Sequence, residues 1–320
     1  YPLRRQRQMC IRDSLNTYYF KKHRRDLSNV TPLLGFDPDD GLGLGAMYNY
    51  QKNSLVRNPF TDEHHIGFTY FFETSSINAE YSGEFAYIFD KVNFELEARY
   101  SSPSYTDNFF GFGNETIDFE DEFGRDFNRV RTEQISIMPS LIFRGYQGSL
   151  ITLGIRYDNY EIENTADRFI AQAGIDPNNF DGQDFGSIEA SYEYDNLKNA
   201  IVSKAGLGAK LTLGYTSNLS NSNNFGYLIP EARIATKLDN RGSIVLASKV
   251  KSQINFGNDF EFYQGATIGG NDGLRGFRNE RFTGKRSFYH STDVRVSLGR
   301  LRNSIIPITI GAYGGFDYGR

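Results

Sequence analysis

Residues 207–216 read LGAKLTLGYT, and their pattern is typical of one class of fold. Apolar residues stand at every second position from Leu207 to Tyr215, with polar or small residues between them. Successive side chains of a β-strand point to opposite faces, so this alternation predicts a strand with one apolar and one polar face. The same period of two recurs in residues 92–100, VNFELEARY, and in residues 187–195, SIEASYEYD.

Alternating segments of this kind account for most of the chain, and no convincing amphipathic helix interrupts them. Most are about 10 to 14 residues long, whereas the mean strand of a soluble protein has about 5–6. A tilted membrane strand needs about 9–11 residues, so these lengths favour a transmembrane barrel over the alternative, a soluble sandwich. The twelve predicted strands are residues 42–51, 63–74, 77–89, 92–102, 129–141, 147–159, 186–195, 206–216, 226–238, 243–254, 287–299 and 307–318.

The composition fits the same class. The chain has 21 Tyr and 27 Phe but no Trp, and its mean hydropathy is only −0.51. No run approaches 18 apolar residues, which excludes a membrane-spanning helix, whereas a membrane barrel can look soluble because its strands are half apolar. The net charge of −4 argues against a nucleic-acid partner, which would favour a basic surface.

The connections between predicted strands alternate in length. Those at 75–76, 103–128, 160–185, 217–225 and 255–286 are mostly long, and the intervening ones are shorter on average. Outer-membrane barrels place long loops outside and short turns in the periplasm. If the connection 255–286 is external, the connection before residue 42 is external too, and we expect a strand before it, within residues 15–34 or upstream.

The two ends of the chain differ from its middle. Residues 1–14, YPLRRQRQMCIRDS, are basic, lack alternation and resemble translated adapter sequence, with a natural basic tail as the alternative. Residues 15–41 are interpreted as an N-terminal lead-in that can hold a first strand and an external loop. Residues 42–320 are interpreted as a partial outer-membrane barrel with an inward-folded loop at 255–286. Because the last predicted strand stops at GGFDYGR, we expect a fragment truncated at both ends.

The densest candidate site lies in residues 262–288, FYQGATIGGNDGLRGFRNERFTGKRSF, where six glycines predict a loop. Two further cations, Arg278 and Arg281, follow its central motif closely. A flexible basic surface loop is the alternative interpretation. The central motif is Gly273, Leu274, Arg275, Gly276 and Phe277.

Two carboxylates on the following strands are candidate partners for this loop. In strand 287–299 the apolar face leaves Asp293 pointing the other way, and in strand 307–318 the same holds for Asp317. Both would project into the lumen, where Arg275 from an inward-folded loop could pair with them. The planar fork of arginine suits carboxylates better than the point charge of lysine.

The motif GLRGF resembles the (V/L)RGF/Y motif in the inward-folded loop of the bacterial surface antigen family. This family comprises BamA/TamA-type barrels, including two-partner secretion translocators. In the family the motif arginine contacts acidic residues on the two following strands, and the matching positions are Arg275, Asp293 and Asp317. GGFDYGR matches the family's F-D-x-G strand motif. The family often has Glu where this chain has Asp293, a conservative difference that keeps the carboxylate.

Two upstream stretches extend the resemblance. DPDDGLGLG at 37–45 and NFFGFGNET at 108–116 resemble motifs of a Bacteroidota branch, in which some members carry a calcineurin-like phosphoesterase domain before the barrel. The resemblance implies an all-β, transmembrane antiparallel barrel of sixteen strands in the full protein. About twelve, the second to the thirteenth, would be visible here.

The resemblance also implies a function and a location. The protein would be an integral barrel of a Gram-negative outer membrane, and it would act in the insertion or translocation of proteins or lipids. Its partners would be outer-membrane lipids and lipopolysaccharide, together with unfolded outer-membrane proteins or secreted substrates. A barrel that anchors a phosphoesterase fusion and a passive pore or structural barrel are the alternatives.

We predict no catalytic residues, no metal site and no cofactor within these residues. The single Cys10 excludes an internal disulfide and any multi-cysteine metal site. His290 and Asp293 lie three positions apart on a strand, so they face opposite sides and form no catalytic dyad. Six aspartates could ligate calcium but lack the full EF-hand spacing and occur among ordinary turn formers. They are Asp37, Asp39, Asp40, Asp176, Asp181 and Asp184.

Overall fold

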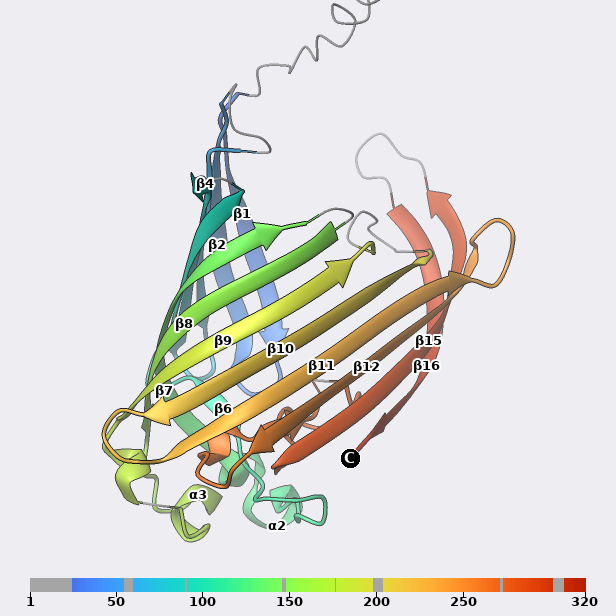
Figure 1. The fold of residues 1–320 in the computed structure, drawn as a ribbon. Helices are drawn as coiled ribbons and strands as arrows, with labels where there is room; N and C mark the ends of the chain where they lie inside the picture. Colours follow the sequence, from blue (N-terminus) through green and yellow to red (C-terminus); the bar gives the residue numbers. More distant parts are fainter. Residues whose placement is uncertain are drawn as a thin grey trace, which may run out of the picture.

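A computed structural model describes residues 25–54, 60–89, 91–145, 148–175, 177–197, 204–270, 273–301 and 308–320. The predicted artefact at 1–14 and the calcium candidate Asp176 lie outside these residues. The described chain forms one large antiparallel sheet, strongly tilted and curled into an incomplete barrel wall (Figure 1). This architecture confirms the predicted all-β barrel class.

Thirteen long strands of the described chain follow one another in sequence order, each paired with the next. Their bounds are β1 (Leu27–Asp37), β2 (Gly41–Lys52), β3 (Asp62–Phe71), β4 (Ser76–Phe89), β5 (Val92–Ser101), β7 (Arg129–Arg144), β8 (Ser149–Ile162), β9 (Gln183–Asp195), β10 (Gly206–Asn218), β11 (Asn224–Lys237), β12 (Ile244–Phe256), β15 (Arg286–Leu301) and β16 (Ile308–Gly319).

Short elements occupy the connections. The strand β6 (Thr106–Asn108) pairs with β7, and β13 (Ala266–Ile268) pairs with β14 (Phe282–Gly284) in a separate small ladder. None of the helices in the described ranges is long and apolar enough to cross a membrane. These helices are α2 (Glu120–Phe123), α3 (Phe169–Gln172) and the 3₁₀ turns Arg125–Asn128, Pro177–Phe180 and Phe262–Gln264.

The twelve long strands predicted from alternation are all present, and β1 is an additional one. It lies within the predicted lead-in 15–41 and pairs with β2 over its whole length, from Leu27 opposite Gln51 to Asp37 opposite Gly41. In the described sheet β1 and β16 are the two edge strands, since each pairs with only one long neighbour.

The sheet is apolar on its outside and polar on its inside. On β10, Leu211 and Leu213 are 41% and 50% exposed, whereas Thr212 and Thr216 on the opposite face are buried. The neighbouring residues Ala190 and Leu228 are in register with Leu213, so the apolar face is continuous across strands. Exposed apolar bands of this kind are the lipid-facing surface of a membrane barrel.

The two faces of the sheet predict that a change of charge affects stability strongly on the outside and weakly on the inside. Leu211→Arg is expected to destabilise the folded barrel by roughly 2–4 kcal/mol, because it places a cation on the lipid face near the middle of β10. The matched change Lys210→Gln, on the inner face of the same strand, is expected to stay within about 0.5 kcal/mol. Urea unfolding in lipid vesicles measures both, and equal effects would contradict the assignment of the faces.

The tightly packed regions lie at one end of the sheet, among the loops. The connections at this end are 38–40, 72–75, 102–128, 163–182, 219–223 and 257–285, and we call it the long-loop end. The helices α2 and α3 lie here, at the bottom of the view (Figure 1). One buried cluster joins three of these loops to strand ends and consists of Phe109, Val130, Ile162, Ile170 and Phe262.

Candidate functional site

The connection from β12 to β15 forms a folded hairpin, which we call the inner loop (residues 257–285). A 3₁₀ turn closed by a capping box between Glu261 and Gln264 begins it. The ladder of β13 with β14 then pairs Ala266 with Gly284 and Ile268 with Phe282. Because this ladder pairs the two sides of the loop, the predicted motif 273–277 lies at the tip of the hairpin.

Two residues of the motif dock the loop on β15. Gly273 has a φ of +117°, and a Cβ added to it would lie 2.3 Å from the Tyr289 ring, so only glycine fits. Leu274 is buried in a small cluster with Ile268 and Tyr289. Its backbone N–H donates to Gly269 O at 2.9 Å, and Leu274 O accepts from Phe277 N. The turn therefore presents Arg275 towards the strands.

Arg275 meets both predicted carboxylates. Its Nε and Nη2 donate to the two oxygens of Asp317, each at 2.7 Å, and Nη1 lies 2.9 Å from Asp293 Oδ1. The paired bonds to Asp317 are the bidentate geometry for which a guanidinium is shaped. The Arg275 guanidinium also lies 5.8 Å from the Tyr313 ring centroid. The structure thus brings these residues together, and their role as a functional latch stays a prediction.

The strand register explains why the three charged groups meet. Asp317 lies opposite Ser291, and Gly315 lies opposite Asp293 in the β15–β16 pair. A Cβ on Gly315 would come 2.2 Å from Asp293 Oδ1 and 2.5 Å from Arg275 Nη2, so its lack of a side chain makes room for the guanidinium. Sequence reasoning missed Gly315, although a glycine opposite a carboxylate in the hairpin register was a usable signal.

The charge on Arg275 is secured by its partners. Hydrogen bonds to Asp317 and then to Asp293 raise the pKa of the Arg275 guanidinium above its ordinary value. The arginine side chain is 40% exposed, whereas those of Asp293 and Asp317 are 16% and 11% exposed. The site is therefore a partly hydrated ion-pair triad, centred on a permanently charged arginine, that can hold the loop against β15 and β16.

The remaining loop residues lie elsewhere. Arg278 and Arg281 do not reach the triad but contact the first hairpin and the 102–128 loop. Phe277 is half exposed and packs edge-on against Phe282. The sequence prediction grouped these two arginines with Arg275, whereas in the structure the three arginines contact different partners.

The residues considered for an enzyme site or a metal site do not come together in the structure. His290 points outward and contacts Ser248 Oγ at 2.9 Å and Thr292 Oγ1 at 2.8 Å, whereas Asp293 points inward to Arg275. Sequence reasoning did not identify Ser248 as a neighbour of His290. In the part of the chain that the structure describes, no group of three or more His, Cys, Asp or Glu side chains could hold a metal ion.

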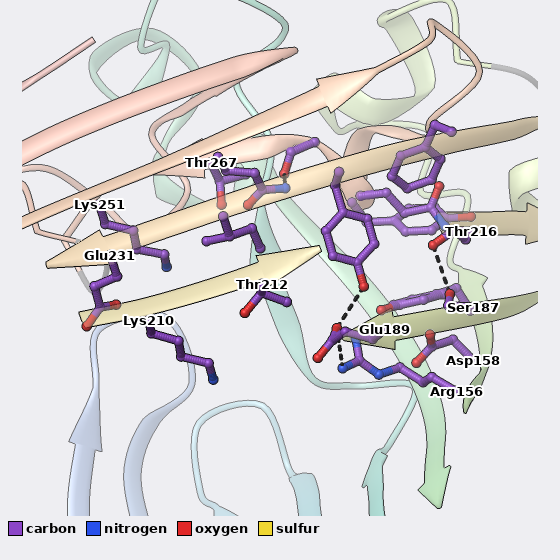
Figure 2. Close-up of a pocket in the computed structure, with 18 residues that line it drawn as sticks. Arg156, Asp158, Ser187, Glu189, Lys210, Thr212, Thr216, Glu231, Lys251 and Thr267 are labelled. Atoms are coloured by element: carbon purple, nitrogen blue, oxygen red, sulfur yellow. Dashed lines mark hydrogen bonds and ion pairs between the residues drawn. The ribbon is translucent and has the colours of Figure 1, made fainter. Parts of the chain in front are cut away.

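A polar pocket of about 510 Å³ lies on the inner face of β8 to β12, against the inner loop (Figure 2). Its walls carry charges of both signs that partly neutralise each other. Arg156 Nη2 lies 3.1 Å from Glu189 Oε2, which also accepts a hydrogen bond from Tyr227 at 2.7 Å. Lys210 and Glu231 line the far side of the pocket (Figure 2). The inner face is thus a polar, mixed-charge lumen.

Comparisons with known proteins agree with the barrel fold. Residues 23–301 match the sequence profile of the Omp85 superfamily domain. The crystal structure of BamA from Haemophilus ducreyi lacking POTRA domains 1–3 is similar, with a TM-score of 0.63 and 16% sequence identity. The match covers 88% of this chain and 55% of that chain, and at this identity it shows the fold alone. No curated protein matches the chain.

Proposed function

The chain belongs to the Omp85 superfamily, and from this membership we propose that it inserts or translocates proteins or lipids at the outer membrane. The Omp85 domain and the BamA-like fold imply that this protein is an integral barrel of a Gram-negative outer membrane. The apolar outer face of its sheet contacts the membrane lipids. The match to the BamA chain covers only 55% of that chain's length, so the activity of the whole protein is part of the proposal.

The contact of Arg275 with Asp293 and Asp317 carries the proposal. Residues of the inner loop line the lumen pocket beside β8 to β12, so the loop is folded onto the inner wall of the sheet. The triad ties the tip of that loop to β15 and β16 by three short contacts. A loop held by ion pairs can change partners without refolding the barrel, which suits a wall that must open for a substrate.

The substrates that fit this proposal are unfolded outer-membrane proteins, secreted proteins and outer-membrane lipids including lipopolysaccharide. The proposal assigns no catalytic step and no cofactor to these residues. Its chemistry is the making and breaking of non-covalent contacts between the loop, the wall and the substrate.

An insertion assay in lipid vesicles tests the proposal through Asp317. The full-length protein is expected to accelerate the folding of a model outer-membrane barrel into the vesicles. Asp317→Ala should abolish most of this acceleration, because it removes both acceptors of the Arg275 fork. Asp317→Glu keeps the carboxylate and should have the milder effect.

Two outcomes count against the function. If the full-length protein conducts small solutes in planar bilayers but never accelerates insertion or translocation, it is a passive pore. If Asp317→Ala inserts substrate as fast as the unmodified protein, the triad has no part in transport.

A further inference from the structure

The inner loop has a second set of contacts, which is separate from the triad. There the motif NFFGFGNET (108–116) forms a cradle for the β13–β14 ladder. Gly113 N donates to Thr283 O at 2.8 Å, next to a parallel bridge between Phe112 and Thr283. Arg281 donates from both terminal nitrogens to Thr116, to Oγ1 and to the backbone O, each at 2.7 Å. The loop is therefore docked along its length.

Asp39, in the turn between β1 and β2, is the buried acceptor of a further group of contacts beside this cradle. Its side chain is only 1% exposed, and burial of a carboxylate is costly unless cations and donors surround it. Arg278 Nη2 lies 3.0 Å from Asp39 Oδ1, and Asn108 Nδ2 donates to Asp39 Oδ2 at 2.6 Å. Arg129 Nε adds a further cation at 3.6 Å.

Arg278 uses both terminal nitrogens of its guanidinium in this place. Nη2 donates to Asn108 Oδ1 at 2.6 Å as well as to Asp39, and Nη1 donates to Arg125 O at 3.1 Å. The guanidinium also lies 5.4 Å from the Phe110 ring centroid. At 12% exposure the side chain is well shielded from water, so these bonds are weakly screened. One arginine thus joins the inner loop to the first hairpin and to the 102–128 loop.

The two arginine sites belong to opposite ends of the strand order. Arg275 binds β15 and β16, whereas Arg278 binds the turn from β1 to β2. Ten strand spacings separate β2 from β15, which would be about 50 Å along a flat sheet. The Cα atoms of residues 275 and 278 can be at most about 11 Å apart. The loop tip therefore spans the curled sheet from one end of the strand order to the other.

We propose that Arg278, held by Asp39 and Asn108, is a second and separable anchor of the inner loop. It braces the β1–β2 hairpin against the β15–β16 hairpin across the lumen and positions the loop independently of the triad. Any movement that separates these hairpins must first release Arg278 or Arg275. The consequence for transport rests on the proposed function, whereas the anchoring does not.

Cysteine accessibility measures the anchoring directly. Thr283 is 3% exposed beneath the 108–116 cradle, and Thr283→Cys puts a smaller side chain with a reactive thiol there. In full-length protein that also carries Cys10→Ser, a membrane-impermeant maleimide added to intact cells should label this cysteine slowly. Arg278→Gln is expected to raise the labelling rate about tenfold or more, which corresponds to about 1.4 kcal/mol. Arg278→Lys should be intermediate, because an ammonium cannot bond Asp39, Asn108 and Arg125 O together.

The matched control is Arg131→Gln at the same end of the sheet. Arg131 Nη1 lies 3.0 Å from Glu163 Oε2, an exposed pair that joins β7 to the end of β8 and does not touch the inner loop. It should change labelling by less than about twofold. Heat-modifiable gel mobility verifies that each barrel is folded. If Arg278→Gln does not fold, Asn108→Ser weakens the same anchor without removing a charge. This variant should also raise the labelling rate, by a smaller factor.

Equal labelling of the folded Arg278 and Arg131 variants, or of the Asn108 variant and its parent, would overturn the second anchor. Labelling does not depend on substrate, so the result separates the anchor from the proposed function. Raised labelling with unchanged insertion activity would support the anchor and count against the role of the loop in transport.

Discussion

Replacing Arg275 by alanine is expected to lower the stability of the folded barrel by about 1.5–3 kcal/mol and to slow transport. The substitution leaves Asp317 without the cation that bonds it and leaves Asp293 with only Arg295, whose Nη2 lies 3.4 Å from Asp293 Oδ2. Fully buried pairs lose roughly 3–5 kcal/mol when one partner is removed. The smaller value is expected here because the arginine is 40% exposed and solvent screens part of its interaction.

The temperature at which the full-length protein loses its heat-modifiable gel mobility measures this effect. Arg275→Lys should fall between the parent and Arg275→Ala, because lysine keeps the charge and loses the fork. Arg241→Ala, in the exposed turn between β11 and β12, serves as the control for loss of an arginine. Parent-like heat resistance and parent-like transport in Arg275→Ala would end the latch interpretation.

Gly273→Ala is expected to be the more damaging single change, at about 3 kcal/mol or more. The backbone there has a φ of +117°, which strains any residue with a Cβ, and the new methyl group would lie 2.3 Å from the Tyr289 ring. The loop must therefore move away from β15, which pulls Leu274 out of its cluster and Arg275 away from its carboxylates.

Gly276→Ala is the matched control for the second prediction. Gly276 also has a positive φ, +94°, but a Cβ on it would meet no atom within 4 Å. This variant should therefore lose only about 1–2 kcal/mol of stability, which is the cost of the backbone strain that a Cβ adds at a positive φ. Unfolding midpoints of the two variants measure the difference. If both lose the same stability, the close approach of the loop to Tyr289 does not contribute to docking.

The alternation of side chains predicted most of the fold because membrane strands are long, with one face in contact with lipid and the other with the aqueous lumen. Each residue of β10, for example, faces either lipid or the lumen, so its sequence carries the period of two without exception from Leu207 to Thr216. The same rule placed Asp293 and Asp317 on the lumen face, since facing depends only on position along a strand.

The alternation of apolar and polar residues did not identify the strand β1, because its local sequence lacks this pattern. Its sequence, LSNVTPLLGFD, holds Pro32 and two adjacent leucines, so apolar and polar residues do not alternate. Most of its residues are exposed, so neither face is selected by burial. Proline lacks a backbone donor and is tolerated where a strand pairs on one side, as β1 does in the described sheet. Its pairing with β2, rather than its own pattern, makes it a strand.

The barrel class, the facing of each alternating strand, and the candidates Arg275, Asp293 and Asp317 follow from the amino-acid sequence. The pairing of Arg278 with Asp39, a residue 239 positions away in the chain, became visible only in the folded protein. Periodicity reports the direction of a side chain relative to its own strand and carries no information about which distant loop lies beside it. That choice depends on the curl of the whole sheet, which brings its first hairpin and its inner loop together.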